Sequence, residues 1–256
     1  MKIKVSAKEF QTFISAISNV FRGGATLKIY KEYIECIACS EDSASIIVCS
    51  KIHILNEEDI NLSKNESFDI HVPDLQKFIK LLNMNNDDTF TFEIKNNYVY
   101  FKNSKVRGAK FILDDIPAQK IPRHVTADWF NNFNINYSVE LDKSKIKEIL
   151  NIASFADGSD KVYFYQEDNK LIAELNDRTI DNIDNISLIV AEDGKGVIND
   201  KVIIAVNSLS SLVLSVPSIN FNIIEIGNKI RTIEAILFVL ESNGVLVKYL
   251  FNSKLR

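Results

Sequence analysis

The chain carries an internal duplication, and this repeat constrains the fold more than any single motif. A helical apolar stripe near the start returns about 136 residues later with the same three- and four-residue spacing. The first stripe is Phe10, Phe13, Ile14 and Ile17, and the second is Ile146, Ile149, Leu150 and Ala153. Such spacing places the apolar side chains on one face of a helix.

Two further segments repeat at nearly the same distance and in the same order. A second amphipathic helix, with Val72, Leu75, Phe78 and Ile79, is matched by Val206, Leu209, Leu212 and Val213. Each half also closes on a similar strand, at residues 110–113 and 248–251. The repeat predicts two structurally equivalent domains of about 115 to 120 residues, a size that suits independent cores.

Between these helices the sequence is rich in short strands. Runs of β-branched and aromatic residues alternate with polar turns, as at residues 26–30, 33–38, 44–55, 66–71, 89–94, 98–102 and 105–113. We therefore expect an α+β fold in which each domain is a curved antiparallel sheet with two helices on one face. The expected domains are residues 1–115 and 137–256.

Residues 116–136 are expected to form the connector between the domains. This segment contains Pro117, Pro122 and Trp129, and it follows neither a helical nor a strand period. A passive linker is the favoured interpretation. Its apolar residues must nevertheless pack onto a sheet or meet a partner, so a docking strip remains the alternative; these residues are Ile121, Val125, Trp129 and Phe130.

Composition places the chain among folded proteins. Of its 256 residues 46% are hydrophobic, and the formal net charge is −4, so any anion-binding surface must be local. The start of the chain lacks an apolar core of signal-peptide length, and the apolar run at 235–240 is too short to span a bilayer. We therefore expect an intracellular protein.

No catalytic or metal-binding constellation stands out. The spacing Cys36, Cys39, Cys49 and His53 loosely fits a zinc site, but residues three apart on a strand point to opposite faces, so buried structural cysteines are favoured. Gly194-Lys195-Gly196 lacks the full phosphate-loop pattern and is expected to be a turn. The pairs Asp87-Asp88 and Asp114-Asp115 could hold magnesium, although solvated loop charge is favoured. We expect no enzyme activity, no metal and no cofactor.

Charge is segregated between the helices and the rest of the chain. The four predicted helices span residues 6–23, 72–84, 141–155 and 206–217, and they contain seven basic and four acidic residues. The helices together are therefore +3 and the remainder is −7. Solvated lysines are the ordinary explanation for such a face, and contact with DNA phosphates is the alternative that the duplication favours. The fourth helix offers only uncharged donors, namely Asn207, Ser208, Ser210 and Ser211.

Over its whole length the chain resembles a sliding clamp of the proliferating cell nuclear antigen (PCNA) type. The resemblance lies in the order of elements and in three local segments: residues 247–254, residues 110–115 and residues 139–151. A composition rich in Ile, Asn and Lys and poor in Gly suggests a viral or phage member. Clamps of this kind have six domains in a ring, so the resemblance implies a homotrimer that encircles duplex DNA and tethers a DNA polymerase.

The resemblance also assigns residues. The helices of such clamps line the hole, so the DNA-facing residues would be Lys8, Arg22, Lys77, Lys80, Lys143, Lys145 and Lys147. Subunits would join through Ala109, Lys110, Phe111, Ile112 and Leu113 of one copy and Asn185, Ile186, Ser187, Leu188, Ile189, Val190 and Ala191 of the next. Partner peptides would dock against Ala44, Ser45, Ile121, Pro122, Leu250, Phe251 and Asn252. The acidic exterior would repel DNA.

The implied partners are duplex DNA bound without sequence preference, a polymerase, an ATP-driven loader and further copies of the chain. A nuclease, a ligase or transcription factors would share the same docking site. The implied location is at replicating DNA, in the host cytoplasm for a phage or in the nucleus for a eukaryote or nuclear virus. Two alternatives stay open: a processivity factor of the same fold that binds DNA electrostatically without closing a ring, and a metal-dependent enzyme using Asp114 and Asp115.

Overall fold

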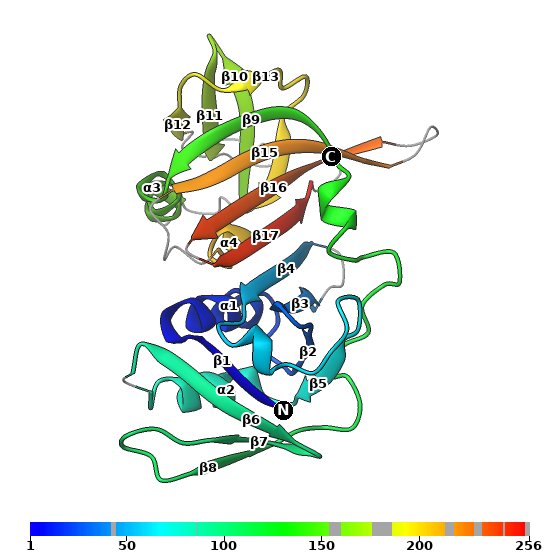
Figure 1. Cartoon of the computed structure of the whole chain (residues 1–256). Helices are drawn as coiled ribbons and strands as arrows, with labels where there is room; N and C mark the ends of the chain where they lie inside the picture. The colour runs from blue at the N-terminus through cyan, green and yellow to red at the C-terminus, as the bar shows by residue number, and fades with distance from the viewer. Residues whose placement is uncertain are drawn as a thin grey trace. The chain divides into compact units, whose positions relative to one another are not determined.

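The protein consists of two compact units that repeat one arrangement of strands and helices (Figure 1). In the computed structural model the described residues are 1–41, 45–85, 87–153, 160–175, 186–212, 218–227, 232–242 and 244–253. Unit 1 comprises residues 1–39, 48–127 and 241–247, and unit 2 comprises residues 40–47, 128–240 and 248–256. The domain boundaries expected from the sequence, after residue 115 and after residue 136, are not tested by this division into units and stay a prediction.

Unit 1 is built from two antiparallel series of strands and two helices. One sheet has the order β1-β6-β7-β8, and the second series runs β4-β3-β2-β5. The elements are β1 (Lys2–Ser6), α1 (Ala7–Val20), β2 (Ala25–Ile29), β3 (Tyr33–Cys39), β4 (Ile46–His53), η1 (Glu57–Asp59), β5 (Phe68–Val72), α2 (Leu75–Leu82), β6 (Thr89–Lys95), β7 (Tyr98–Phe101) and β8 (Ala109–Ile112).

Unit 2 repeats this plan. One sheet has the order β12-β11-β10-β14, and the second series runs β13-β9-β15-β16-β17. The elements are η2 (Trp129–Asn131), β9 (Asn134–Asp142), α3 (Lys143–Ala153), β10 (Lys161–Glu167), β11 (Lys170–Leu175), β12 (Ile186–Ala191), β13 (Lys195–Gly196), β14 (Val202–Ala205), α4 (Val206–Leu209), β15 (Ser218–Gly227), β16 (Thr232–Ser242) and β17 (Val245–Asn252).

The duplication is visible in strand order and in register. β1-β6-β7-β8 corresponds to β9-β15-β16-β17, and β4-β3-β2-β5 corresponds to β12-β11-β10-β14. Phe92 pairs with Phe101 across β6 and β7, and at the equivalent place Phe221 pairs with Phe238 across β15 and β16. The α+β class with duplicated antiparallel sheets is therefore confirmed, with the refinement that each unit has two strand series.

The predicted helical stripes form the cores. Phe10, Phe13, Ile14 and Ile17 of α1 are completely buried, and Phe10 stacks on Phe90 and Phe92 of β6. α1 contacts α2 as well as strands β1, β6 and β3, so it lies across both strand series of unit 1. In unit 2, Ile146 and Ile149 of α3 are equally buried, and α3 contacts α4, β9 and β12.

All four helices are shorter within the described residues than the sequence predicts, and α2 and α4 differ most in proportion to their length. α2 covers Leu75–Leu82 rather than 72–84, because Val72 ends strand β5 and Asp74 caps the helix by accepting a hydrogen bond from Lys77 N at 2.8 Å. α4 covers only Val206–Leu209, and the last part of the predicted helix, residues 213–217, lies outside the described residues. None of the described helices is long and apolar enough to cross a membrane.

The connector is only partly the exposed strip that its sequence suggests. Val125 and Phe130 are buried, at 4% and 2% exposure, whereas Ile121 and Trp129 are half-buried. Trp129 packs edge-on against Phe130 and Phe133, with ring centres 5.4 and 4.8 Å apart. For Val125 and Phe130 the docking-strip interpretation is therefore wrong, because packing already removes both side chains from solvent.

Candidate nucleic-acid and partner interfaces

The basic residues predicted to face DNA in unit 1 are all exposed on the helical layer. Lys8 is in the first turn of α1, and Arg22 follows the end of that helix. Lys77 and Lys80 lie three residues apart on α2, on the side opposite the buried residues Leu75, Phe78, Leu81 and Leu82. α1 and α2 contact each other, so these four cations belong to one helical pair.

In unit 2 the three predicted lysines differ from one another. Lys147 is exposed, whereas Lys143 and Lys145 are half-buried. Lys145 Nζ lies 3.0 Å from a carboxylate oxygen of Glu148, so its charge is already partnered on the helix surface. Ser144 N donates a hydrogen bond of 2.7 Å to Asp142 Oδ1. This bond lowers the pKa of the Asp142 carboxyl and so keeps a negative charge beside Lys143. Lys147 is thus the cation of α3 best placed for an external phosphate.

The uncharged donors of the fourth helix are not equally available. Asn207 and Ser210 are exposed, but Ser210 Oγ already donates to Asn207 O at 2.6 Å. Ser211 is 9% exposed, and the prediction that it could reach a phosphate is therefore wrong. Burial follows from the turn after Leu209, where Leu212 enters the core with Ser211 beside it.

The predicted peptide pocket is found in part. A cavity of about 190 Å³ in unit 2 is lined by Ser45, Ile204, Ala205, Ser208, Phe251, Asn252 and Ser253. Three predicted residues, Ser45, Phe251 and Asn252, are among them. Asn252 N donates to Ser45 O at 3.1 Å, and Ile203 N donates to Ser253 Oγ at 3.2 Å, so one main-chain bond and one bond to a side-chain hydroxyl shape this wall.

The other predicted pocket residues lie elsewhere. Leu250 is fully buried and does not line the cavity, and Ala44 lies outside the described residues. Ile121 and Pro122 belong to the connector of unit 1, where Gln119 holds the chain by bonding both the N–H and the carbonyl of Cys39, at 2.9 and 2.7 Å. Sequence reasoning missed the β14–α4 junction at Ile204, Ala205 and Ser208, although the internal repeat had placed a helix start there.

Both strands predicted to join subunits are sheet edges. β8 ends the order β1-β6-β7-β8, and β12 ends the order β12-β11-β10-β14. Each edge exposes one large aliphatic side chain: Ile112 is 52% exposed and Ile189 is 47% exposed. Phe111, Leu113 and Val190 point into the cores. Asn185 lies outside the described residues.

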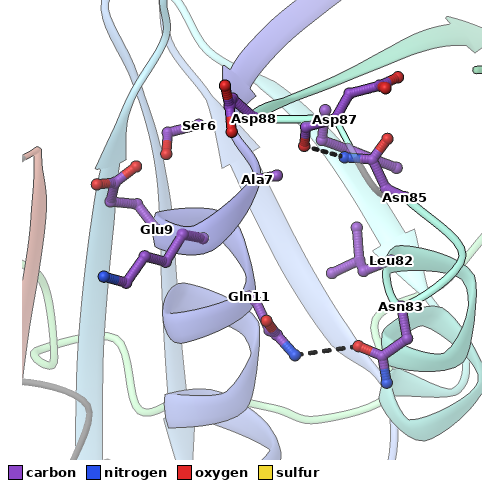
Figure 2. Close-up of a pocket in the computed structure, with 11 residues that line it drawn as sticks. Ser6, Ala7, Glu9, Gln11, Leu82, Asn83, Asn85, Asp87 and Asp88 are labelled. Atoms are coloured by element: carbon purple, nitrogen blue, oxygen red, sulfur yellow. Dashed lines mark hydrogen bonds between the residues drawn. The ribbon is translucent and has the colours of Figure 1, made fainter.

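A second, larger cavity of about 610 Å³ opens at the start of α1 (Figure 2). Its wall is polar and includes Glu9, Asp87 and Asp88, with Gln11 Nε2 donating to Asn83 Oδ1 at 3.0 Å. Asn85 Nδ2 donates to Asp87 O at 2.9 Å and fixes the turn before β6. Among the described residues, no three His, Cys, Asp or Glu side chains are grouped so that they could hold a metal ion.

The remaining motifs have structural explanations. Cys36, Cys39 and Cys49 are buried free thiols, and His53 is exposed. Burial, with smaller contributions from Cys49 and Glu35, raises the pKa of the Cys36 thiol well above its ordinary range. Lys195 and Gly196 form the short strand β13, paired with Ser138 and Tyr137 of β9, so this segment is not a phosphate loop before a helix.

Comparison with known proteins identifies the fold. No protein-family model and no curated protein sequence matches the chain. Among solved structures it is similar to A. fulgidus PCNA bound to the C-terminal region of FEN-1, with 14% identity, a TM-score of 0.72 and coverage of 100% of this chain and 98% of that one.

Two further structures agree over nearly the full length. PCNA from Entamoeba histolytica has 11% identity, a TM-score of 0.74 and coverage of 99% and 98%, and PCNA from Thermococcus kodakaraensis has 18% identity, a TM-score of 0.72 and coverage of 99% of both chains. The duplicated units, their strand order and these alignments together show that the chain has the fold of the PCNA sliding clamps.

Proposed function

We propose that this protein is a sliding clamp: three copies close head to tail around duplex DNA and tether a DNA polymerase and other DNA-processing proteins. The observation that carries the proposal is the pair of exposed sheet edges, one in each unit. β8 of unit 1 and β12 of unit 2 each expose an isoleucine, and an edge strand gains hydrogen bonds by pairing with another chain. Pairing of two different edges is heterologous, and such contacts generate a ring when the rotation closes.

The charge distribution supports a loose grip on DNA. Lys8, Arg22, Lys77, Lys80 and Lys147 are exposed on helices or at a helix end, where cations can approach phosphates from outside the core. Lys143 and Lys145 take part more weakly, since Asp142 and Glu148 lie beside them. Phosphate contacts carry no sequence information, so a ring held by them can move along the duplex.

Partners would dock in the cavity bounded by Ser45, Phe251 and Asn252. Its wall combines the apolar surface of Ile204 and Phe251 with hydroxyl and amide groups, which suits a short peptide with both kinds of side chain. The A. fulgidus PCNA structure, which contains the C-terminal region of FEN-1, makes a nuclease a reasonable partner besides polymerase, ligase, transcription factors and an ATP-driven loader. We propose a scaffold at replicating DNA, without a catalytic step of its own.

The mass of the protein in solution tests the ring. Light scattering across a dilution series should give three times the 29.1 kDa of one chain, and the trimer should be retained on closed circular DNA but slide off after the circle is cut. A monomer at every concentration, with binding to linear DNA that falls steeply with salt, would instead support an electrostatic processivity factor that does not close a ring.

A further inference from the structure

The outer face of the sheet β1-β6-β7-β8 is basic and aromatic, in contrast to the acidic exterior that total charge suggests. Figure 1 shows these four strands side by side. Along each strand alternate residues are buried: Ile3 and Val5 of β1 point inward, whereas Lys2 and Lys4 are exposed. On β7 the buried Val99 is flanked by the half-buried Tyr98 and Tyr100.

Strand register brings these outer residues into rows. Lys2 pairs with Glu93, Glu93 with Tyr100, and Tyr100 with Lys110, so one row crosses all four strands. A neighbouring row runs from Lys95 through Tyr98 to Ile112. Lys110 Nζ lies 4.1 Å from the centre of the Tyr98 ring. Glu93 is the acid in these rows, and Lys95 Nζ lies 3.2 Å from its carboxylate.

The connection between β7 and β8 extends this positive surface. It spans residues 102–108 and carries Lys102, Lys105 and Arg107, all of them exposed. Among the described residues none of these three cations forms an ion pair. The cations and tyrosines on the outer face of these strands, together with residues 102–108, are called the basic sheet face below; they are Lys2, Lys4, Lys95, Lys110, Tyr98 and Tyr100. Glu93 and Ile112 lie on the same face.

The connection is held in one conformation by its own side chains. Asn103 Oδ1 accepts hydrogen bonds from Lys105 N and Val106 N, at 2.9 and 2.6 Å, and Asn103 Nδ2 donates to Met84 O at 3.0 Å. Tyr100 Oη donates to Arg107 O at 3.4 Å. A loop that is already ordered loses little conformational entropy when its cations meet a ligand.

The second unit provides an internal comparison. Counted from the strand–helix junction, Lys2 corresponds to Ser138, and the row in unit 2 continues through Asn222 to Leu237 without a charge at these three positions. β16 ends at Ser242 and β17 begins at Val245, so the hairpin needs only two connecting residues. The basic row and the longer connection of unit 1 are therefore not requirements of the fold.

We propose that the basic sheet face binds a single strand of nucleic acid. Lysine and arginine side chains neutralise phosphates, and half-exposed tyrosine rings stack on bases that are not paired. A duplex keeps its base faces stacked internally, so tyrosines could contribute little to binding it. This site is distinct from the helical cations, and binding to it does not require ring closure. Pairing along the edge of β8 would cover Ile112, whereas Lys2 and Lys4 lie on β1 at the opposite edge of the sheet.

Binding of a fluorescein-labelled oligothymidylate, followed by anisotropy over a salt series, tests the proposal on the full chain. Neutralising the connection with K102Q, K105Q and R107Q should lower the slope of log affinity against log salt by about 2, as expected when three phosphate contacts on a single strand are lost. The matched control K28Q, K64Q and K195Q removes the same charge from exposed positions outside this face and should keep the parent slope.

Substitutions of Tyr98 distinguish base stacking from electrostatic attraction as contributions to oligothymidylate binding. Tyr98→Leu should weaken oligothymidylate binding about tenfold, whereas Tyr98→Phe, which keeps the ring, should bind like the parent. Equal slopes for the connection and control variants would overturn the proposal, as would loss of binding only on neutralising Lys77, Lys80 and Lys147. Dissociation of the trimer by the connection variant, with unchanged oligothymidylate binding, would overturn it in favour of a contact between copies.

Failure of this inference and failure of the sliding clamp are distinguishable. If the parent binds no oligothymidylate at low salt but still forms a trimer retained on circular duplex DNA, the single-strand site is wrong and the clamp stands. If the connection variant loses oligothymidylate binding and the parent protein forms no trimer at any concentration, the single-strand site stands and the ring is wrong.

Discussion

Individual side chains show where this chain buries an unpaired polar group and where it buries its thiols. Tyr137 of β9 is completely buried, and within the described part of the chain its hydroxyl has no hydrogen-bond partner. A Cβ added at Gly194 would come within 1.9 Å of that hydroxyl oxygen. The unpaired Tyr137 hydroxyl, whose burial lowers the free energy of unfolding, therefore lies where residue 194 must be glycine.

Substitutions on the two sides of this contact should act in opposite directions. Tyr137→Phe removes the unpaired hydroxyl and should leave the free energy of unfolding unchanged or raise it by up to about 1 kcal/mol. Gly194→Ala forces a methyl group into the occupied space and should lower stability by about 1 to 3 kcal/mol. Guanidinium unfolding of both variants measures the difference, and a destabilised Tyr137→Phe would mean that the hydroxyl has a partner.

The three cysteines should be unreactive while the chain is folded. Burial raises the pKa of the Cys36 and Cys39 thiols, which disfavours the thiolate that attacks a disulfide reagent, and Cys49 is also buried. An aromatic disulfide reagent at pH 8 should react with none of them in buffer and with all three in guanidinium. Rapid labelling of one thiol in the native protein would contradict this burial.

At the level of elements, the ends of helices and the edges of sheets decide stability and assembly. α1 and α2 differ in how they begin. Asp74 caps α2 through its carboxylate, whereas Ser6, at the same position before α1, makes no side-chain capping bond. Unit 1 therefore contains one helix start with a side-chain cap and one without.

Removal of the two capping residues should have unequal effects. Asp74→Ala should lower the free energy of unfolding by about 1 kcal/mol, because Lys77 N loses its acceptor at the start of α2. Ser6→Ala should change stability by less than about 0.5 kcal/mol, since no capping bond is lost. Chemical denaturation of the two variants gives both values, and equal losses would show that the cap bond at Asp74 contributes little.

Charge at either sheet edge should weaken assembly of the trimer. Ile112→Glu on β8 and Ile189→Glu on β12 each place a charge on an exposed aliphatic position that the ring would bury, so each should shift the trimer to monomer by at least tenfold in dissociation constant, on the order of 1.4 kcal/mol. Ile116→Glu is the control, because Ile116 is 73% exposed and lies outside the strands. Light scattering that finds intact trimers for both edge variants would refute this interface.

For the whole molecule, function depends on where charge lies rather than on its sum. The net charge is −4, yet exposed cations gather on helices α1, α2 and α3 and on the basic sheet face. Long-range attraction to phosphates depends on this local distribution. The net charge of the whole chain therefore could not locate either the helical cations or the basic sheet face.

Reversal of the helical cations should abolish sliding without unfolding the protein. K77E, K80E and K147E should leave the midpoint of thermal unfolding nearly unchanged, because exposed charges contribute little to stability, but should prevent retention on circular DNA and stimulation of polymerase. K28E, K64E and K195E provide a control of equal charge change. Lys145→Gln alone should have a small effect, since Glu148 already partners that lysine. Full retention of the K77E, K80E and K147E variant on circular DNA would exclude these residues from DNA contact.

The sequence by itself determined the duplicated plan of this chain. Strands at 89–94 and 98–102 were predicted within a residue of β6 and β7, and the stripe of Phe10, Phe13 and Ile14 is part of the core of unit 1. These features follow from periodicity, because burial of one face of a helix or strand leaves a regular pattern in the chain. The assignments of DNA-facing, docking and interface residues remain predictions.

The tertiary structure decided which residues from distant segments share a surface. Ile204, Ala205 and Ser208 join Ser45 and Phe251 in one cavity, and Phe130 is buried by Trp129 and Phe133 rather than exposed in a linker. Lys2, Tyr100 and Lys110 form a row only through the register of four strands. Periodicity along the chain reports which face a residue occupies, but pairing between strands fixes its neighbours, and that pairing depends on the packing of the whole unit.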